Sequence, residues 1–395
     1  MYFLLISLLL GGAYLGIGGR TPMFYFFDLV FIVTLLRMAW NLTPINLSDK
    51  WVFGVGILCL FTQMITALAN LTDIYKSLYF LKTFVVGLIF YGIACSCRYK
   101  VRPAAIALFL AGFGAVVARG ELSGLLSEDV RVAVAKGEFD LGFVTSNFAA
   151  SFLILALPIV IVFAFQTTGR KRLFYGGCAI IGSAGLLLTF CRGAIFALLA
   201  ATVASIGLMV RAGLRIRRLF TVTALAAVAC AMLLSRVDTP VLMDAYGYFT
   251  EQFDVGDQNR MDLWNKAIAT FTSHPVLGIG PGQFVNYTED VGFWGFKLNA
   301  HNSYLQALAE MGVVGSLPLF GLLGLVAWRT YKHAHDTLDP VAIAIWVAIF
   351  AGLLHNVVES TLYSLHFQIL FWSLAAIAWR NIQARHRPHQ IAGIA

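Results

Sequence analysis

Two arginines and one histidine are the side chains in this sequence best suited to chemistry. Arg192 follows the apolar run 173–190, and Arg260 and His301 lie in the long polar segment 237–303. A guanidinium group is planar, permanently charged and able to donate two parallel hydrogen bonds, so it suits phosphate oxygens. An imidazole, with an unperturbed pKa of about 6.5, can accept a proton near neutral pH. This set predicts a site that binds a lipid-linked pyrophosphate and activates a hydroxyl group.

Each of these side chains also has a structural interpretation. An arginine at the end of a membrane helix often extends its guanidinium group to the interface. Arg260 can pair with acidic residues of the same polar segment, and His301 can cap a helix that begins beside it. Lys82, near the end of an apolar run, can approach a phosphate or extend to the interface. The residues alone leave these alternatives open.

A further polar pair lies near the carboxyl end of the chain. His355 and Glu359 are four residues apart, and on one helix face they would suit a proton relay or, as the favoured interpretation, a polar clamp between helices. The cysteines and histidines form no cluster at zinc-site spacing. We therefore expect neither a metal ion nor a cofactor.

The composition defines the class of protein that must position these groups. Of the 395 residues, 59% are hydrophobic and only 12% are charged, so the chain lacks the polar surface of a soluble domain of this size. The formal net charge is +8, but the basic residues form small clusters between apolar runs. We therefore expect an integral membrane protein that contacts lipid headgroups and no nucleic acid.

Apolar runs long enough to cross a bilayer follow one another along the whole chain. A helix needs about 20 apolar residues to span the ~30 Å hydrocarbon core. Twelve runs meet this criterion: residues 2–18, 22–40, 51–69, 77–95, 103–118, 146–166, 173–190, 194–210, 219–235, 312–329, 339–358 and 363–380. The pattern predicts an all-α polytopic membrane protein with about 12 transmembrane helices, in which residues 1–395 form a single transmembrane domain.

The charges of the connecting loops predict the orientation of these spans. Lys and Arg collect on the cytoplasmic side of membrane proteins. Alternate loops and the tail are basic: Arg98, Lys100 and Arg102; Arg170, Lys171 and Arg172; Arg211 to Arg218; Arg329 and Lys332; and Arg380, Arg385 and Arg387. Both termini should therefore be cytoplasmic. The acidic segment 237–303, between spans 9 and 10, should then be a large helical loop in the periplasm of a bacterial inner-membrane protein.

Two helices separated by a glycine-rich turn are predicted within and just after this loop. Asp257-Gln258-Asn259 can cap a helix that begins near Arg260, and His274-Pro275 should end it. Gly278 to Gly282 form a flexible turn that matches neither a P-loop nor a dinucleotide fingerprint. A second helix is expected from about His301 to Met311, leading through Gly312 into the next span.

Several short motifs of this region, taken together, resemble the signature of the O-antigen ligase and polymerase superfamily. The motifs are Arg260-Met-Asp-Leu-Trp264, His274-Pro-Val-Leu-Gly-Ile-Gly-Pro-Gly-Gln-Phe284, Ala300-His-Asn-Ser-Tyr-Leu305 and Glu310-Met-Gly312-Val-Val-Gly315. Cys191-Arg-Gly-Ala194 resembles the Ser-Arg-Gly turn of that family, with cysteine in place of serine. The motif resemblance extends over about residues 175–330.

The resemblance implies a membrane glycosyltransferase and a role for each matching residue. Members of the family move a glycan from undecaprenyl pyrophosphate to an acceptor on the periplasmic face, in an inverting reaction without a metal. Carried over, this implies that Arg192 and Arg260 hold the pyrophosphate and that His301 activates the acceptor hydroxyl. Trp264 and Asn302 lie in the same motifs and are expected to contact substrate.

The acceptor separates the remaining hypotheses. A ligase that uses a lipid A-core acceptor is favoured by the compact chain without an appended soluble domain. A polymerase of O-antigen or exopolysaccharide repeat units, with a growing glycan as its acceptor, shares the donor and most of the signature. A transporter would be expected to show interrupted spans and internal repeats, and neither is obvious here.

Overall fold

The structure, a computed structural model, describes residues 47–70, 73–96, 106–108, 110–115, 146–189, 191–214, 228, 232, 260–288 and 299–386. Within these ranges every regular element is a helix, as expected. The elements are α3 (Lys50–Ala69), α4 (Ile74–Ser96), α7 (Ser146–Gln166), α8 (Gly169–Leu188), α9 (Arg192–Ala204), α10 (Ile206–Arg211), α13 (Ser303–Thr337), α14 (Pro340–His355) and α15 (Leu365–His386), with short 3₁₀ helices η1 (Phe284–Tyr287) and η2 (Thr361–Tyr363). Residues 260–273 form a further helix.

Four of the described helices are long and apolar enough to cross a membrane. They are α3, α4, residues 147–166 of α7, and α13. Apolar helices α9 and α14 are shorter. The chain is therefore a helical membrane protein, and the predicted spans 51–69, 77–95, 146–166 and 173–190 correspond to α3, α4, α7 and α8. Predicted spans 2–18 and 22–40 lie outside the described residues, and of span 219–235 only residues 228 and 232 are described.

One predicted span, 194–210, is wrong as a single helix. The structure contains α9 and α10 with a break at Ser205, whose φ of −98° and ψ of 0° interrupt the helical backbone. The Ser205 hydroxyl donates a 2.8 Å hydrogen bond to the Ala201 carbonyl. A serine hydroxyl that bonds to a carbonyl of the preceding turn competes with the backbone hydrogen bonds of the helix and can bend it. Counting apolar residues does not detect this effect.

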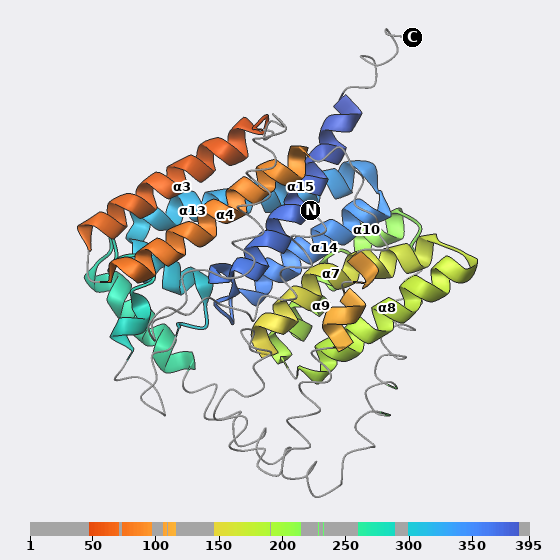
Figure 1. Cartoon of the computed structure of the whole chain (residues 1–395), viewed down its shortest axis with the longest axis horizontal. Helices are drawn as coiled ribbons and strands as arrows, with labels where there is room; N and C mark the ends of the chain where they lie inside the picture. Colours follow the sequence, from red (N-terminus) through yellow and green to blue (C-terminus); the bar gives the residue numbers. More distant parts are fainter. Residues whose placement is uncertain are drawn as a thin grey trace, which may run out of the picture.

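Helix α14 is the central element of the bundle. It packs against α7 and α9 on one side and against α13 on the other, while α15 packs on α4 and α13 on α3; Figure 1 shows α14 between the two groups of helices. Half of its buried residues are alanine or glycine. Gly352 is so closely packed that an added Cβ would lie 2.9 Å from Leu155. Small residues let membrane helices approach closely, which gives dispersion contacts in place of a hydrophobic driving force.

A buried ion pair joins helices at the end of the bundle opposite His301. Arg329 donates a 2.6 Å hydrogen bond to the Asp49 carboxylate, which also accepts one from the Tyr91 hydroxyl. The guanidinium group of Arg329 stacks 4.7 Å from the ring of Trp379. Asp49 is almost fully buried and also accepts a hydrogen bond from the Val52 amide, so the buried charge is compensated by three partners. Arg329 thus belongs to the bundle as well as to the basic loops.

The predicted break at Gly312 is a kink inside α13. Gly312 has φ 56° and ψ −163°, a conformation that essentially only glycine adopts. The intrahelical bonds expected at this point are replaced by bonds to the glycine-rich segment. The amides of Val313 and Val314 donate to the carbonyls of Pro275 and Val276, at 2.9 and 3.1 Å. The kink therefore joins the loop to the span.

Gly312→Ala is expected to destabilise the protein strongly. A Cβ at this position would lie 2.3 Å from the Val276 carbonyl oxygen, and the backbone conformation alone costs about 1–3 kcal/mol for a residue other than glycine. Thermal unfolding in detergent should show a lower midpoint for this variant. Gly321→Ala is the matched control in the same helix, because a Cβ there meets nothing within 4 Å. Equal midpoints for the two variants would contradict the importance of the kink.

Candidate active site

The helix 260–273 and the glycine-rich segment form a small cap with its own apolar core. Buried residues from the helix, the turn and the start of α13 form this cluster: Leu263, Ala267, Ile279, Phe284, Ala300 and Ala309. Arg260 is the first described residue of this helix, which is followed by turns from residue 275, where the predicted end lies. The expected capping residues 257–259 lie outside the described residues. Burial of this cluster holds Arg260, at the first residue of the helix, in a defined place.

The glycine-rich segment fixes this cap to α13 and α4. The amides of Ile279 and Gly280 donate to the carbonyls of Ala309 and Glu310, at 3.1 and 2.8 Å. These carbonyls are the ones that the kink at Gly312 frees. Gly278, Gly280 and Gly282 have positive φ values, which explains the repeated glycines. On the other side, the Gln283 side chain donates to the Asp73 carbonyl at 2.7 Å, and Ser77 donates to the Pro281 carbonyl. The segment is a structural clamp, consistent with its interpretation as a turn.

His301 is held in an unusual backbone conformation directly before α13. Its φ of 47° lies in the left-handed region, which is uncommon for a residue other than glycine and is often found at functional sites. The N-cap of α13 is the next residue, Asn302, whose side-chain oxygen accepts hydrogen bonds from the amides of Tyr304 and Leu305, both at 3.0 Å. The capping role considered for His301 therefore belongs to Asn302, and the imidazole is left for another function.

Glu359 is the partner of His301, a pairing that the sequence did not indicate. The Nδ1 atom of His301 lies 2.8 Å from Glu359 Oε1. The suggested relay between His355 and Glu359 on one helix face is not what the structure contains, because α14 ends at His355 and the chain then turns. The turn moves Glu359 off the helical face and towards the start of α13. A four-residue spacing predicts a shared face only where the helix continues.

The chain between α14 and η2 is joined to the start of α13 by further hydrogen bonds. The Ser303 amide donates to the Asn356 carbonyl at 2.9 Å, and the Ser303 hydroxyl donates to the Asn356 side chain at 2.6 Å. The Tyr363 hydroxyl donates to the Ser303 carbonyl at 3.1 Å. These bonds keep the two backbones in fixed register, so the contact between His301 and Glu359 does not depend on one side-chain rotamer.

Charge and burial act in opposite directions on the His301–Glu359 pair. The negative charge of Glu359 raises the pKa of His301, although burial and the positive charge of Arg260 oppose this effect. Burial acts to raise the pKa of Glu359, but the charge and hydrogen bond of His301, together with the Ser360 amide, lower it well below its usual range. Glu359 is therefore an ionised acceptor at neutral pH, and the raised pKa of His301 is a property of the pair.

The Cys191-Arg192-Gly193 turn packs against the end of α14. The Cys191 sulfur lies 3.5 Å from His355 Nε2, and a Cβ on Gly193 would lie 2.6 Å from Val358. This close approach is a reason for glycine after Arg192. Burial raises the pKa of the Cys191 thiol to about 12, so this thiol is a neutral packing group and not a nucleophile. Arg192, the first residue of α9, is exposed.

Arg260 belongs to the same cluster of groups. The pKa values of His301 and Cys191 are both raised, mainly by the charge of Glu359 and by burial respectively, and the positive charge of Arg260 partly opposes each rise. Arg260 is therefore near enough to His301 and to the Cys191–Gly193 turn to act on both electrostatically. These residues come from three chain segments: the turn 191–193, the helix 260–273 and the position directly before the cap of α13.

The other residues expected to contact substrate are Trp264, Asn302 and Lys82. Trp264 is partly buried on the helix 260–273, and its indole nitrogen has no hydrogen-bond partner among the described residues. Asn302 is buried and uses its side-chain oxygen for the cap. Lys82 lies partly buried on α4, with its ammonium group 5.3 Å from the Tyr79 ring centroid. Of these residues, only Asn302 adjoins His301 in the sequence.

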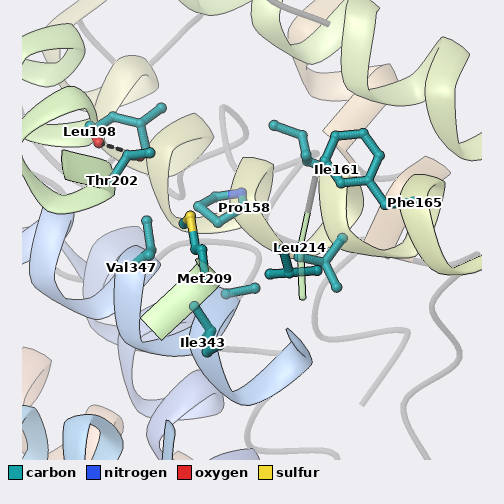
Figure 2. A pocket seen from close by; sticks show the side chains of 11 residues that line it. Pro158, Ile161, Phe165, Leu198, Thr202, Met209, Leu214, Ile343 and Val347 are labelled. Atoms are coloured by element: carbon teal, nitrogen blue, oxygen red, sulfur yellow. Dashed lines mark hydrogen bonds between the residues drawn. The ribbon is translucent and has the colours of Figure 1, made fainter. Parts of the chain in front are cut away.

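A separate apolar pocket lies between α7, α9, α10 and α14, towards the opposite end of the bundle. Its volume is about 80 Å³, and Pro158, Met209 and Ile343 are among its lining residues. Figure 2 shows the side chains that line it, with the one hydroxyl, that of Thr202, bonded to the Leu198 carbonyl. A pocket with this lining offers no group that could neutralise a phosphate. The polar cluster around His301 is therefore the candidate active site.

These features define a helical membrane protein with arginine and histidine side chains gathered at one end of its bundle. Residues 177–320 match the model of a family described as O-antigen ligase. The match contains Arg192, Arg260 and His301, and this segment of the chain is similar to the O-antigen ligase superfamily. A search of curated proteins found no match. The family implies a membrane glycosyltransferase of the ligase or polymerase type.

Proposed function

We propose that this protein transfers a glycan from undecaprenyl pyrophosphate to a lipid A-core acceptor, at the periplasmic face of a bacterial inner membrane. The observation that carries the proposal is the pairing of His301 with a buried carboxylate, beside Arg260 and the turn that contains Arg192. One base and two cations are the groups that this reaction needs, because pyrophosphate is already a good leaving group.

In the proposed mechanism, each group has one task. The imidazole of His301 takes the proton of the acceptor hydroxyl as the oxygen attacks the anomeric carbon of the donor sugar. The bond between that carbon and the pyrophosphate oxygen breaks on the opposite face, so the configuration is inverted. The electron pair leaves with the pyrophosphate, and Arg192 and Arg260 neutralise the charge that develops there. No step requires a metal ion, and Lys82, Trp264 and Asn302 are proposed to contact the substrates.

We also propose twelve spans, with both termini cytoplasmic and residues 237–303 periplasmic. The directions of the described helices support this topology. The amino ends of α7, α9 and α13 and the carboxyl end of α14 meet around the His301 cluster. The Asp49–Arg329 pair and the basic loop residues lie at the other ends of these helices.

Reporter fusions will check the orientation. Alkaline phosphatase fused after Tyr287 should be active, because the enzyme folds only outside the cytoplasm, and a fusion after Lys171 should be inactive. Green fluorescent protein at the same two positions supplies the matched control, with the opposite pattern expected. An active Lys171 fusion together with an inactive Tyr287 fusion would reverse the topology and the side of the active site.

Reconstitution of the purified protein in liposomes tests the reaction itself. The donor is undecaprenyl-pyrophosphate glycan, and two acceptors are offered separately: lipid A-core, and the same glycan on its lipid carrier. Transfer to lipid A-core is the expected result. Extension of the glycan alone would identify a repeat-unit polymerase instead, and movement of the donor across the membrane without transfer would indicate a transporter.

A further inference from the structure

We propose that Glu359 is a positioning residue for His301 and that Asn147 holds the Glu359 carboxylate in place. This inference rests on the proposed function, because it assigns the group that orients the catalytic imidazole. The three residues come from separate elements. Asn147 is in the first turn of α7, His301 precedes α13, and Glu359 follows α14.

The hydrogen bonds of Glu359 determine which nitrogen of His301 is free. Glu359 Oε1 lies 2.8 Å from His301 Nδ1 and also accepts the Ser360 amide at 3.0 Å. An ionised carboxylate is only an acceptor, so Nδ1 of a neutral imidazole must hold the proton. Nε2 then presents its lone pair. The pair therefore selects the tautomer in which Nε2 can act as a base, as a carboxylate does for the histidine of a serine protease.

Asn147 fixes the second carboxylate oxygen. Its side-chain amide donates a 2.6 Å hydrogen bond to Glu359 Oε2. With both oxygens bonded, the carboxylate plane cannot rotate without losing a partner. Glu359 is only 4% exposed, and a buried charge that loses a partner is strongly penalised. The carboxylate therefore holds one orientation, and the imidazole bonded to it does so as well.

Charged and titratable groups on several of the elements around this pair act on it. Glu359 faces His301 directly, and Arg260 from the helix 260–273 acts on His301 with the opposite sign. His355 at the end of α14 and Cys191 at the start of α9 also act electrostatically with Glu359. Among these groups, Glu359 is the largest influence that favours a protonated His301. Its neutralisation should therefore make His301 easier to deprotonate.

The pH dependence of transfer tests this assignment. The base form of His301 is the active form, so the rate should rise with pH through the pKa of His301. In Glu359→Gln this acid limb should move to lower pH, because the negative charge that favours the protonated imidazole is gone. The maximal rate should fall by about 10²-fold or more, since the amide no longer enforces the required tautomer. A merely structural role would lower the amount of folded protein without moving the limb.

Two variants keep the test decisive. Glu310→Gln neutralises another fully buried carboxylate, which accepts hydrogen bonds from Gln306 and the Phe284 amide, and its acid limb should stay in place. Asn147→Ala keeps the Glu359 charge but releases one oxygen. We expect it to lower the rate about 10-fold, the range seen when a supporting hydrogen bond to a site residue is removed, with the limb unmoved. This second variant also carries the test if Glu359→Gln does not fold.

The outcomes separate this inference from the proposed function. Suppose that His301→Ala has lost transfer, while folded Glu359→Gln keeps the rate and the acid limb of the unmodified protein. The positioning role of Glu359 is then wrong, and the proposed role of His301 as the base still stands. If Glu359→Gln does not fold, an unchanged rate in Asn147→Ala overturns the positioning role. If His301→Ala itself transfers glycan normally, the proposed base is wrong, and the pair is a structural contact.

Discussion

Replacing His301 with alanine is expected to lower glycan transfer by about 10²- to 10⁴-fold, the usual contribution of general acid–base catalysis. The reason is that the imidazole is proposed to accept the proton of the attacking hydroxyl. Among the described residues, Glu359 is its hydrogen-bond partner. Donor binding should be retained, because Arg192 and Arg260 are the residues proposed to hold the pyrophosphate. Transfer is measured in proteoliposomes, and donor binding is measured separately with labelled undecaprenyl-pyrophosphate glycan.

His301→Asn is the control that separates catalysis from local structure. Asparagine tolerates the left-handed backbone conformation that His301 adopts, and the helix cap at Asn302 is untouched. This variant should therefore fold normally and still fail to transfer. If it keeps nearly full activity, His301 is not the base, whatever the alanine variant does.

Arg192→Ala and Arg260→Ala are each expected to lower transfer by about 10²- to 10³-fold, the typical loss when one group that stabilises developing negative charge is removed. Each guanidinium group is proposed to bond the pyrophosphate in the transition state more strongly than in the bound donor. The loss should therefore fall mainly on kcat, with a smaller rise in KM. Steady-state kinetics with purified donor gives both values.

Two further substitutions make this prediction specific. Arg260→Lys keeps the charge but loses the planar fork, so it should restore little activity. Arg211→Ala removes an exposed arginine at the other end of the bundle and should leave transfer unchanged. A near-normal rate for Arg260→Lys would contradict the two-point phosphate geometry. A large loss in Arg211→Ala would show that net charge, and not position, is responsible.

Much of the fold could be predicted because its determinants are local. The apolar runs that became α3, α4 and α7 are long enough to cross a bilayer, and backbone groups in lipid must bond within their own helix. The break at Gly312 could be predicted for a similar reason, because it depends on glycine's access to positive φ values. The split at Ser205 could not, since it depends on a hydroxyl that bonds to the preceding turn.

The residue types of the site were determined by the sequence, and their partners by the tertiary structure. Arg192, Arg260 and His301 are recognisable because only a few side chains bind phosphate or accept a proton near neutral pH. The pairing of His301 with Glu359, and of Glu359 with Asn147, joins positions 58 and 212 residues apart. No spacing rule reaches that far. These pairings form because α14 ends at His355, the chain then turns, and α7 packs against α14. All three features depend on the packing of the whole bundle.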